Sequence, residues 1–393
     1  MPVQTQYELT GDWTSVADGE VFLQTISTET GVHLDSIGKS VEGRDLWRLT
    51  MGSGNNLILI TSGVHGTEPA SREAILMMAR NVSYNSSGQY TEYLTNHKIM
   101  IIPTMNPDRM HVQYRNAQHI DINRGMYPLD SPEAIAFAKV LIENNPDMFV
   151  DFHERSGTSD QIQFVRAMHL DPNSDETVRS STQNALSFIM SNLAGMGYDA
   201  GYYPEGYTGF GSNTSGAGIL GYIAFTAETF VGASSADLRI SMHKATFDLA
   251  LEWHSQNQSL IKSFKEKFLN DMIKPNNTFI LLTGLEDGKE FYPLATKVPI
   301  ITPEGYNLVS PADFSLWQNV YGMLMSTDGF VPINQRAGRM IPHLLDPGSD
   351  IAVRPATRKE PLTPPERTDG RYTKVLYTDG WRDVFVKNYL NAQ

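Results

Sequence analysis

The chain has 393 residues, of which 44 are acidic and 31 basic, so its formal net charge is −13. A charge of this sign disfavours nucleic acid and anionic membrane surfaces as partners. The sequence contains no cysteine, which excludes disulfides, thiolate zinc sites and cysteine nucleophiles. Any metal must therefore be held by histidines and carboxylates.

The first residues lack the basic stretch and apolar core of a secretory signal, and no apolar run approaches the roughly 18 to 20 residues of a membrane span. We therefore expect a cytoplasmic or particle-associated protein with no membrane partner. The length exceeds that of one ordinary domain, which favours a core domain with an appendage.

Apolar residues in the first two thirds of the chain alternate between helical spacing and short strand-like runs. This alternation predicts an α/β fold with a mixed, mainly parallel sheet flanked by helices. Helices are expected over residues 20–31, 68–82, 132–144, 179–197 and 236–269. Strands are expected as a hairpin within 32–50 and over 57–62, 98–103, 148–152 and 223–227, with a loop at 201–221.

The composition changes after Lys274 and Pro275, where proline and glycine become frequent. We divide the chain there into a core domain of residues 1–272 and a smaller β-rich accessory domain of residues 273–393, which is suited to docking on a partner. Short strands are expected in the second domain at 278–283, 298–302, 329–333, 351–353 and 375–377.

Polar residues stand at the ends of two predicted strands. His65 and Glu68 follow the run 57–62, and His153 ends the run 148–152. The carboxyl ends of parallel strands meet at one edge of a sheet, and two histidines with one glutamate form a common catalytic zinc set. The His65 and Glu68 pair alone is equally consistent with a helix cap.

The neighbours of His153 add to this pattern. Asp151 lies two positions earlier on the same strand face, where a carboxylate can orient a ligand histidine. Glu154 is expected to be a solvated surface charge.

Several motifs follow one another in a fixed order. They are Gly63-Val-His-Gly-Thr-Glu68, Asn106-Pro-Asp108, the run from Arg115 to Arg124, Asp151-Phe-His153 and Phe225-Thr-Ala-Glu228. Over roughly residues 10 to 265 the series resembles the zinc metallocarboxypeptidase family of the carboxypeptidase A type. The resemblance implies that fold, one zinc ion per chain, and a peptide substrate with a free C-terminal carboxylate.

The resemblance also implies roles for single residues. In that family the positions of His65, Glu68 and His153 bind zinc, and the position of Glu228 is the general base that activates water to cut the C-terminal peptide bond. The remaining roles are oxyanion stabilisation by Arg115, terminal carboxylate binding by Asn123 and Arg124, and closure over substrate by Tyr207, with Tyr203 and Tyr222 as rivals.

Two positions depart from the family pattern: Arg109 stands where glycine is frequent, and Gly125 replaces the second asparagine of Asn-Arg-Asn. No acidic residue lies at 209–221, which argues against a preference for lysine or arginine. Three alternatives stay open: a deacylase of small N-acyl amino acids similar to aspartoacylase or succinylglutamate desuccinylase, a cell-wall peptide amidase, and a structural or binding protein on a peptidase fold.

Overall fold

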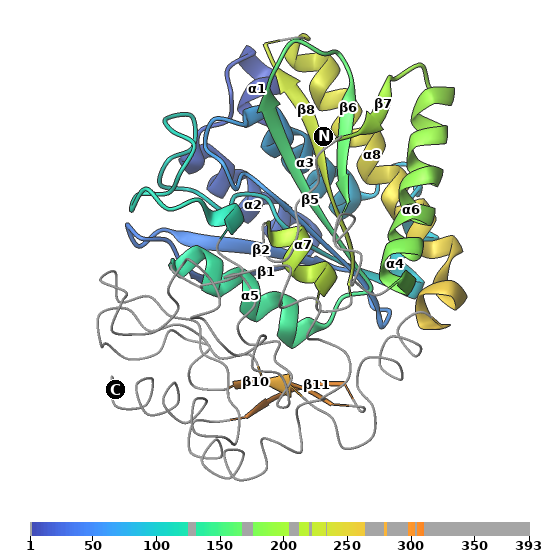
Figure 1. Cartoon of the computed structure of the whole chain (residues 1–393). Coiled ribbons are helices and arrows are strands. Elements are labelled where there is room, and N and C mark those ends of the chain that lie inside the picture. The colour runs from blue at the N-terminus through green and yellow to red at the C-terminus, as the bar shows by residue number, and fades with distance from the viewer. Residues whose placement is uncertain are drawn as a thin grey trace, which may run out of the picture.

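The computed structural model describes residues 2–124, 131–166, 176–203, 212–219, 222–232 and 234–263, together with three short strands farther on. An eight-stranded mixed sheet lies at the centre of the first six segments (Figure 1). Its order is β1-β2-β4-β3-β5-β8-β6-β7. The strands are β1 (His33–Lys39), β2 (Asp45–Met51), β3 (Asn56–Ser62), β4 (His97–Ile102), β5 (Met148–Ser156), β6 (Ile162–Arg166), β7 (Ala200–Tyr202) and β8 (Ile223–Val231).

The middle of the sheet is parallel and carries the chemistry-bearing strands. β4, β3, β5 and β8 pair in parallel, and β6 pairs with β7 in the same way. The pairs β1 with β2, β2 with β4, and β6 with β8 are antiparallel. The predicted mixed, mainly parallel sheet is confirmed.

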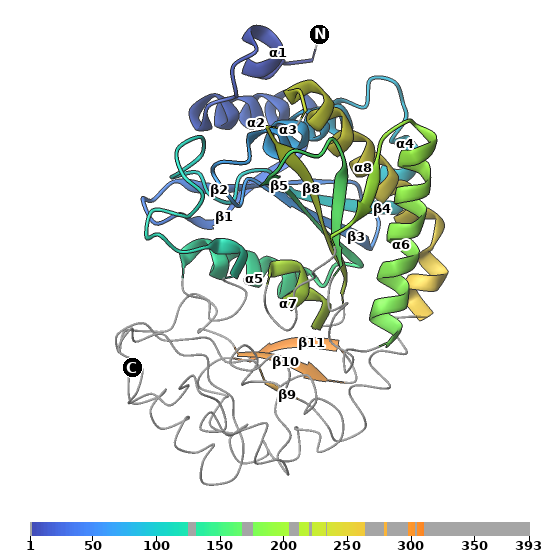
Figure 2. The same cartoon turned by 45° about the horizontal axis from the view of Figure 1, so that its top comes forward.

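Helices cover both faces of the sheet (Figure 2). The layer with α2, α3 and α8 lies on one face, and α5 and α7 lie on the other. The helices are α1 (Gln6–Thr10), α2 (Val16–Thr30), α3 (Pro69–Tyr84), α4 (Thr91–Asn96), α5 (Pro132–Asn144), α6 (Glu176–Gly195), α7 (Asn213–Ile219) and α8 (Ala236–Gln256), with a 3₁₀ turn η1 (Ile122–Arg124).

The central strands are buried on both faces, which explains their nearly continuous apolar sequences. Local signals set the helix ends. Ser131 caps α5 by accepting a hydrogen bond from the backbone N–H of Ala134, Pro132 occupies its first turn, and Asn145 ends it in the left-handed conformation. The helix predicted over 132–144 coincides with α5.

Several elements differ from the expectation. The segment 201–221 was predicted as a loop, but Asn213–Ile219 forms α7, whose sequence NTSGAGI is poor in helix formers and lacks apolar periodicity. Strands β6 and β7 and helices α1 and α4 are not among the predicted elements. The helix expected over 236–269 is described as α8, which ends at Gln256 with Asn257 as its C-cap.

A second, three-stranded antiparallel sheet is formed by β9 (Phe279–Ile280), β10 (Val298–Thr302) and β11 (Gly305–Val309), in the order β11-β10-β9. The prediction for 298–302 coincides with β10. The strands predicted at 329–333, 351–353 and 375–377 lie outside the described residues. Within the described segments, no helix is both long and apolar enough to cross a membrane.

Candidate active site

Three side chains from two neighbouring strand ends meet in a tight cluster. His65 and Glu68 lie in the turn after β3, and His153 lies on β5. One ligand atom from each falls within 4.8 Å of the others, and all three residues are buried. His65 Nδ1 is 2.6 Å from Glu68 Oε1, and His153 Nδ1 is 2.9 Å from Glu68 Oε2. Nitrogen and carboxylate donors that converge in this way suit zinc.

A carboxylate stands behind each histidine of this cluster. His153 Nε2 lies 2.8 Å from Asp151 Oδ2, and His65 Nε2 lies 3.0 Å from Asp121 Oδ1. Each carboxylate can accept the N–H of the outer ring nitrogen, which leaves Nδ1 as the lone-pair donor toward a metal. The orienting role that the sequence suggested for Asp151 fits this geometry, whereas Asp121 had been given no role.

The carboxylates and imidazoles also shift one another's proton affinity. Burial opposes ionisation of Glu68, but His65 and His153 hold its pKa at about 2. Burial likewise lowers the proton affinity of His153, yet the carboxylates of Asp151 and Glu68 hold its pKa well above the usual range. The cluster thus concentrates negative charge around two imidazoles, which is the electrostatic environment that a dication needs.

Two glycines shape the turn that carries His65. Gly63 has φ +60°, a left-handed conformation that costs glycine little. Gly66 is enclosed by backbone, because a Cβ added there would lie 1.9 Å from the carbonyl oxygen of Arg109 and 2.4 Å from that of Gln113. The turn can therefore place His65 and Glu68 against the loop after β4 only if position 66 has no side chain.

Glu228 lies next to the cluster because of strand register. On β8 it pairs with His153 of β5, and it lines the same cavity as His65 and Glu68. Burial raises the pKa of the Glu228 carboxyl, and the nearby His153 opposes that rise. A carboxylate that is largely buried, with 14% of its side chain exposed, beside a metal cluster is placed to exchange a proton with water or substrate.

The cavity in front of the cluster has a volume of about 420 Å³. Its lining includes the cluster residues His65 and Glu68, the carboxylate of Glu228, and Asn123.

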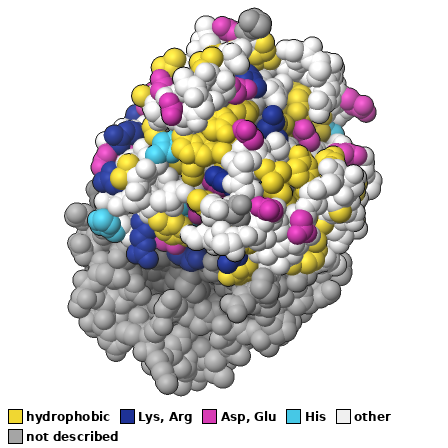
Figure 3. All heavy atoms as spheres, turned by 90° about the horizontal axis from the view of Figure 1, so that it is seen from above, with side chains coloured by type: hydrophobic (Ala, Val, Ile, Leu, Met, Phe, Trp, Pro, Cys, Tyr) yellow, Lys and Arg dark blue, Asp and Glu magenta, His cyan; other side chains and the backbone are white. Residues whose placement is uncertain are grey.

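Figure 3 looks onto the end of the molecule toward which β5 and β8 point in Figure 1, and there acidic, basic and apolar side chains are interspersed on the described surface. The described part of that face therefore carries no single acidic patch that would account for the charge of −13.

Hydrogen bonds in the loop before α5 connect the metal cluster to Asn123 and Arg124, the residues predicted to bind the terminal carboxylate. Asp121 Oδ1, which faces His65, also accepts a hydrogen bond from the backbone N–H of Asn123 at 3.0 Å. The side-chain oxygen of Asn123 accepts from the backbone N–H of Asn213 at the start of α7. Arg124 follows in the same 3₁₀ turn.

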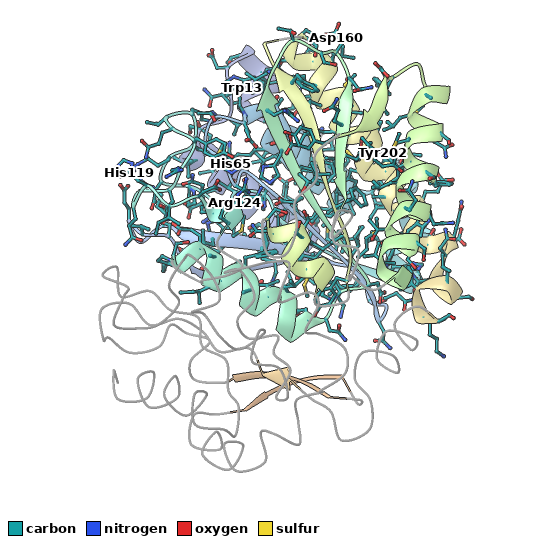
Figure 4. All side chains as sticks on the ribbon, in the orientation of Figure 1. Trp13, His65, His119, Arg124, Asp160 and Tyr202 are labelled. Carbon is teal, nitrogen blue, oxygen red and sulfur yellow. The ribbon has the colours of Figure 1, made fainter. Side chains whose placement is uncertain are left out.

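The other residues predicted to contact substrate are Arg115 and Tyr207, with Tyr203 and Tyr222 as alternatives to Tyr207. Arg115 is exposed, does not line the cavity, and donates a hydrogen bond to the backbone carbonyl of His119. His119 lies at the outer edge of the molecule (Figure 4). Tyr207 lies outside the described residues. Of its rivals, Tyr222 is buried in the core and Tyr203 lines the cavity.

The expectation for Glu154 was wrong. Its side chain is only 2% exposed and accepts hydrogen bonds from Arg239 Nε at 2.6 Å and from the backbone N–H of Ala70 at 2.7 Å. A carboxylate at the start of α3 is favoured by the positive end of the helix. The burial could not be anticipated because Arg239 lies 85 residues away in the sequence.

Comparison with known proteins agrees with this geometry. Residues 20–118 match the family model described as zinc carboxypeptidase. Over these residues the chain is similar to the zinc carboxypeptidases. It is 34% identical over 100 residues to carboxypeptidase M of Mus musculus, and 31% identical over 85 residues to carboxypeptidase D of Anas platyrhynchos. These matches span 23% and 19% of this chain, and only 23% and 6% of the two relatives.

The fold extends the likeness beyond the matched sequence. A crystal structure of a metallo-carboxypeptidase from Burkholderia cenocepacia superimposes with a TM-score of 0.53 and 18% identity, over 62% of this chain and 69% of that one. A structure of a putative carboxypeptidase from Burkholderia mallei gives 0.52 and 18%, over 63% and 68%. The zinc carboxypeptidase family match contains His65 and Glu68, whereas His153 and Glu228 lie beyond it and are placed by the fold.

Proposed function

We propose that the chain is a zinc-dependent carboxypeptidase that removes the C-terminal residue of a peptide. The observation that supports this most strongly is the cavity lined by His65 and Glu68 of the metal cluster together with the largely buried carboxylate of Glu228. The cluster alone indicates that a metal ion can bind, whereas a carboxylate base beside it indicates hydrolysis.

In this proposal, His65, Glu68 and His153 hold zinc, which when bound polarises the scissile carbonyl and lowers the pKa of a water. Glu228 accepts a proton from the attacking water and delivers it to the leaving amine nitrogen as the C–N bond breaks. The products are a shortened peptide with a new carboxylate and a free amino acid.

Substrate orientation is assigned to the loop that Asp121 connects to the cluster. Asn123 and Arg124 would bind the terminal carboxylate of the peptide, since a guanidinium presents paired donors to a carboxylate. We assign the cation for the developing oxyanion to Arg115, which must then leave the carbonyl of His119 when substrate binds. Tyr207 is the proposed closing tyrosine.

The test uses one peptide in two forms, with a free or an amidated C-terminus, and mass spectrometry of the products. We expect release of the C-terminal residue from the free form only, loss of activity with a chelator, and recovery on addition of one equivalent of zinc. Cleavage of N-acyl amino acids but of no peptide would instead indicate a deacylase. Equal cleavage of the free and amidated peptides would contradict a carboxypeptidase.

A further inference from the structure

Arg155 is a cation in the lining of the cavity, and it has no role in the proposed mechanism. We infer that it selects substrates with an acidic side chain on the acyl side of the scissile bond, that is, in the peptide segment before the bond. This inference rests on the proposed carboxypeptidase activity. Arg155 is the only lysine or arginine among the described residues that line the cavity.

Aromatic rings hold the guanidinium in place. Its central carbon lies 4.0 Å from the ring centroid of Tyr203 and 5.3 Å from that of Phe230. Phe230 is itself packed closely, because a Cβ added at Gly157 would lie 2.2 Å from the ring. Stacking on aromatic faces fixes the plane of an arginine and leaves the N–H groups at its edge available for hydrogen bonds.

Within the described part of the protein, no residue accepts a hydrogen bond from those N–H groups. The nearest carboxylate is Glu228, whose Oε2 lies 3.9 Å from Arg155 Nε, too far for a direct hydrogen bond. No hydrogen bond joins the guanidinium to another described residue, and its side chain is 30% exposed. A guanidinium that is fixed, partly exposed and open at its edge can bind a carboxylate with two parallel hydrogen bonds.

The strand direction shows which part of a peptide it would meet. Arg155 lies two residues beyond His153 on β5, which corresponds to roughly 6.6 Å along a strand. In Figure 4, Arg124 lies below His65, whereas Asp160, in the turn that follows β5, lies above it. A peptide whose terminal carboxylate binds Arg124 therefore extends its preceding residues toward Arg155.

A role at the oxyanion predicts a different result from a role in selection. An oxyanion cation would act on every substrate alike, because the scissile carbonyl is common to all of them. A selecting cation acts only on substrates that carry the matching charge. The ratio of kcat/KM values for an acidic and a neutral substrate separates the two roles.

The experiment compares peptides that share their C-terminal residue and carry Glu or the isosteric Gln at the first or second position before the scissile bond. We expect the wild-type protein to prefer Glu at one of these positions by roughly tenfold to a hundredfold, the range of a charge-assisted hydrogen bond. In Arg155→Gln the ratio should fall to about one, and in Arg155→Glu a lysine peptide should become the better substrate. The matched control is Arg48→Gln, whose ion pair with Asp35 lies in the β1–β2 hairpin, and it should keep the wild-type ratio.

Calorimetric binding of the acyl products adds a readout that is independent of turnover. N-acetylglutamate should bind the zinc-loaded wild-type protein more tightly than N-acetylglutamine does, and Arg155→Gln should abolish the difference. Equal cleavage of Glu and Gln peptides by the wild-type protein would overturn the role of Arg155 and leave the carboxypeptidase standing. Failure to cleave any peptide would overturn the proposed function, and the inference with it.

Discussion

Each histidine of the metal cluster is fixed by a carboxylate on its outer ring nitrogen. Asp151 is fully buried on β5, where its other oxygen accepts the hydroxyl hydrogen of Thr61. Asp121 comes from the loop before η1 and bonds both His65 and Asn123. The two carboxylates therefore orient the proposed ligands from different elements.

We expect Asp151→Asn and Asp121→Asn each to weaken zinc binding by roughly tenfold to a hundredfold, since an amide is a poorer acceptor for the imidazole N–H and allows the other tautomer. Competition with a fluorescent zinc chelator measures the dissociation constants. The exposed Asp160 provides the control, because Asp160→Asn should leave the affinity unchanged. Wild-type affinity in both buried variants would show that the carboxylates do not orient the ligands.

At the scale of elements, the turn between β3 and α3 depends on the close approach of Gly66 to the loop after β4. Gly66→Ala places a Cβ against the backbone oxygens of Arg109 and Gln113, neither of which can rotate away as a flexible side chain can. We expect a loss of about 3 kcal/mol in the free energy of unfolding, the upper part of the usual range for overpacking. Zinc affinity should fall as well, because the turn positions His65 and Glu68.

Gly195 provides the matched control for that substitution. It lies at the end of α6, where an added Cβ would have no heavy atom within 4 Å and φ is not positive. Gly195→Ala should leave zinc binding unchanged and the stability equal to or slightly above that of the wild type. Urea denaturation followed by tryptophan fluorescence measures both variants. Equal stability of the two would mean that the turn tolerates a side chain.

Helix α8 contains a carboxyl group whose ionisation should oppose folding. Burial raises the pKa of Asp248, while the hydroxyl of Tyr90, which donates to its Oδ1 at 2.8 Å, and the charge of Lys244 oppose the rise. Because the folded-state pKa lies above the ordinary value, the contribution to stability is complete at low pH and is lost as the pH rises through the folded-state pKa. Asp248→Asn keeps an acceptor for Tyr90 and cannot ionise.

The stability gained by Asp248→Asn over the wild type should therefore be larger at pH 7 than at pH 4. Tyr90→Phe should instead make the free energy of unfolding decline more steeply as the pH rises, because the hydrogen bond that favours the ionised carboxylate of Asp248 is gone. Urea unfolding at both pH values gives the comparison. A larger gain from Asp248→Asn at pH 4 than at pH 7 would contradict the prediction that ionisation of Asp248 destabilises the folded protein.

At the scale of the whole molecule, elements with strong periodicity were predictable and those held by distant contacts were not. The buried runs of β3, β5 and β8 and the helix α5 follow from the pattern of apolar residues. Helix α7 does not, because its polar sequence is anchored from outside by Asn123. The domain boundary at residue 272 stays a prediction.

The metal cluster was predictable for a related reason. His65, Glu68 and His153 stand at strand ends in a recognisable order, and parallel pairing of β3 with β5 brings them together. The positions of Asp121 and Arg155 depend on what faces them in three dimensions: an imidazole 56 residues away for Asp121, and the rings of Tyr203 and Phe230 for Arg155. No local pattern records such contacts.

The central claim is that Glu228 performs proton transfer at a zinc site held by other residues. The most direct measurement is peptide turnover by Glu228→Gln together with its zinc content. We predict that kcat falls by roughly 10² to 10⁴, the usual contribution of general acid–base catalysis, while one zinc ion per chain is retained. A Glu228→Gln protein that binds zinc and cleaves peptides at the wild-type rate would contradict the account.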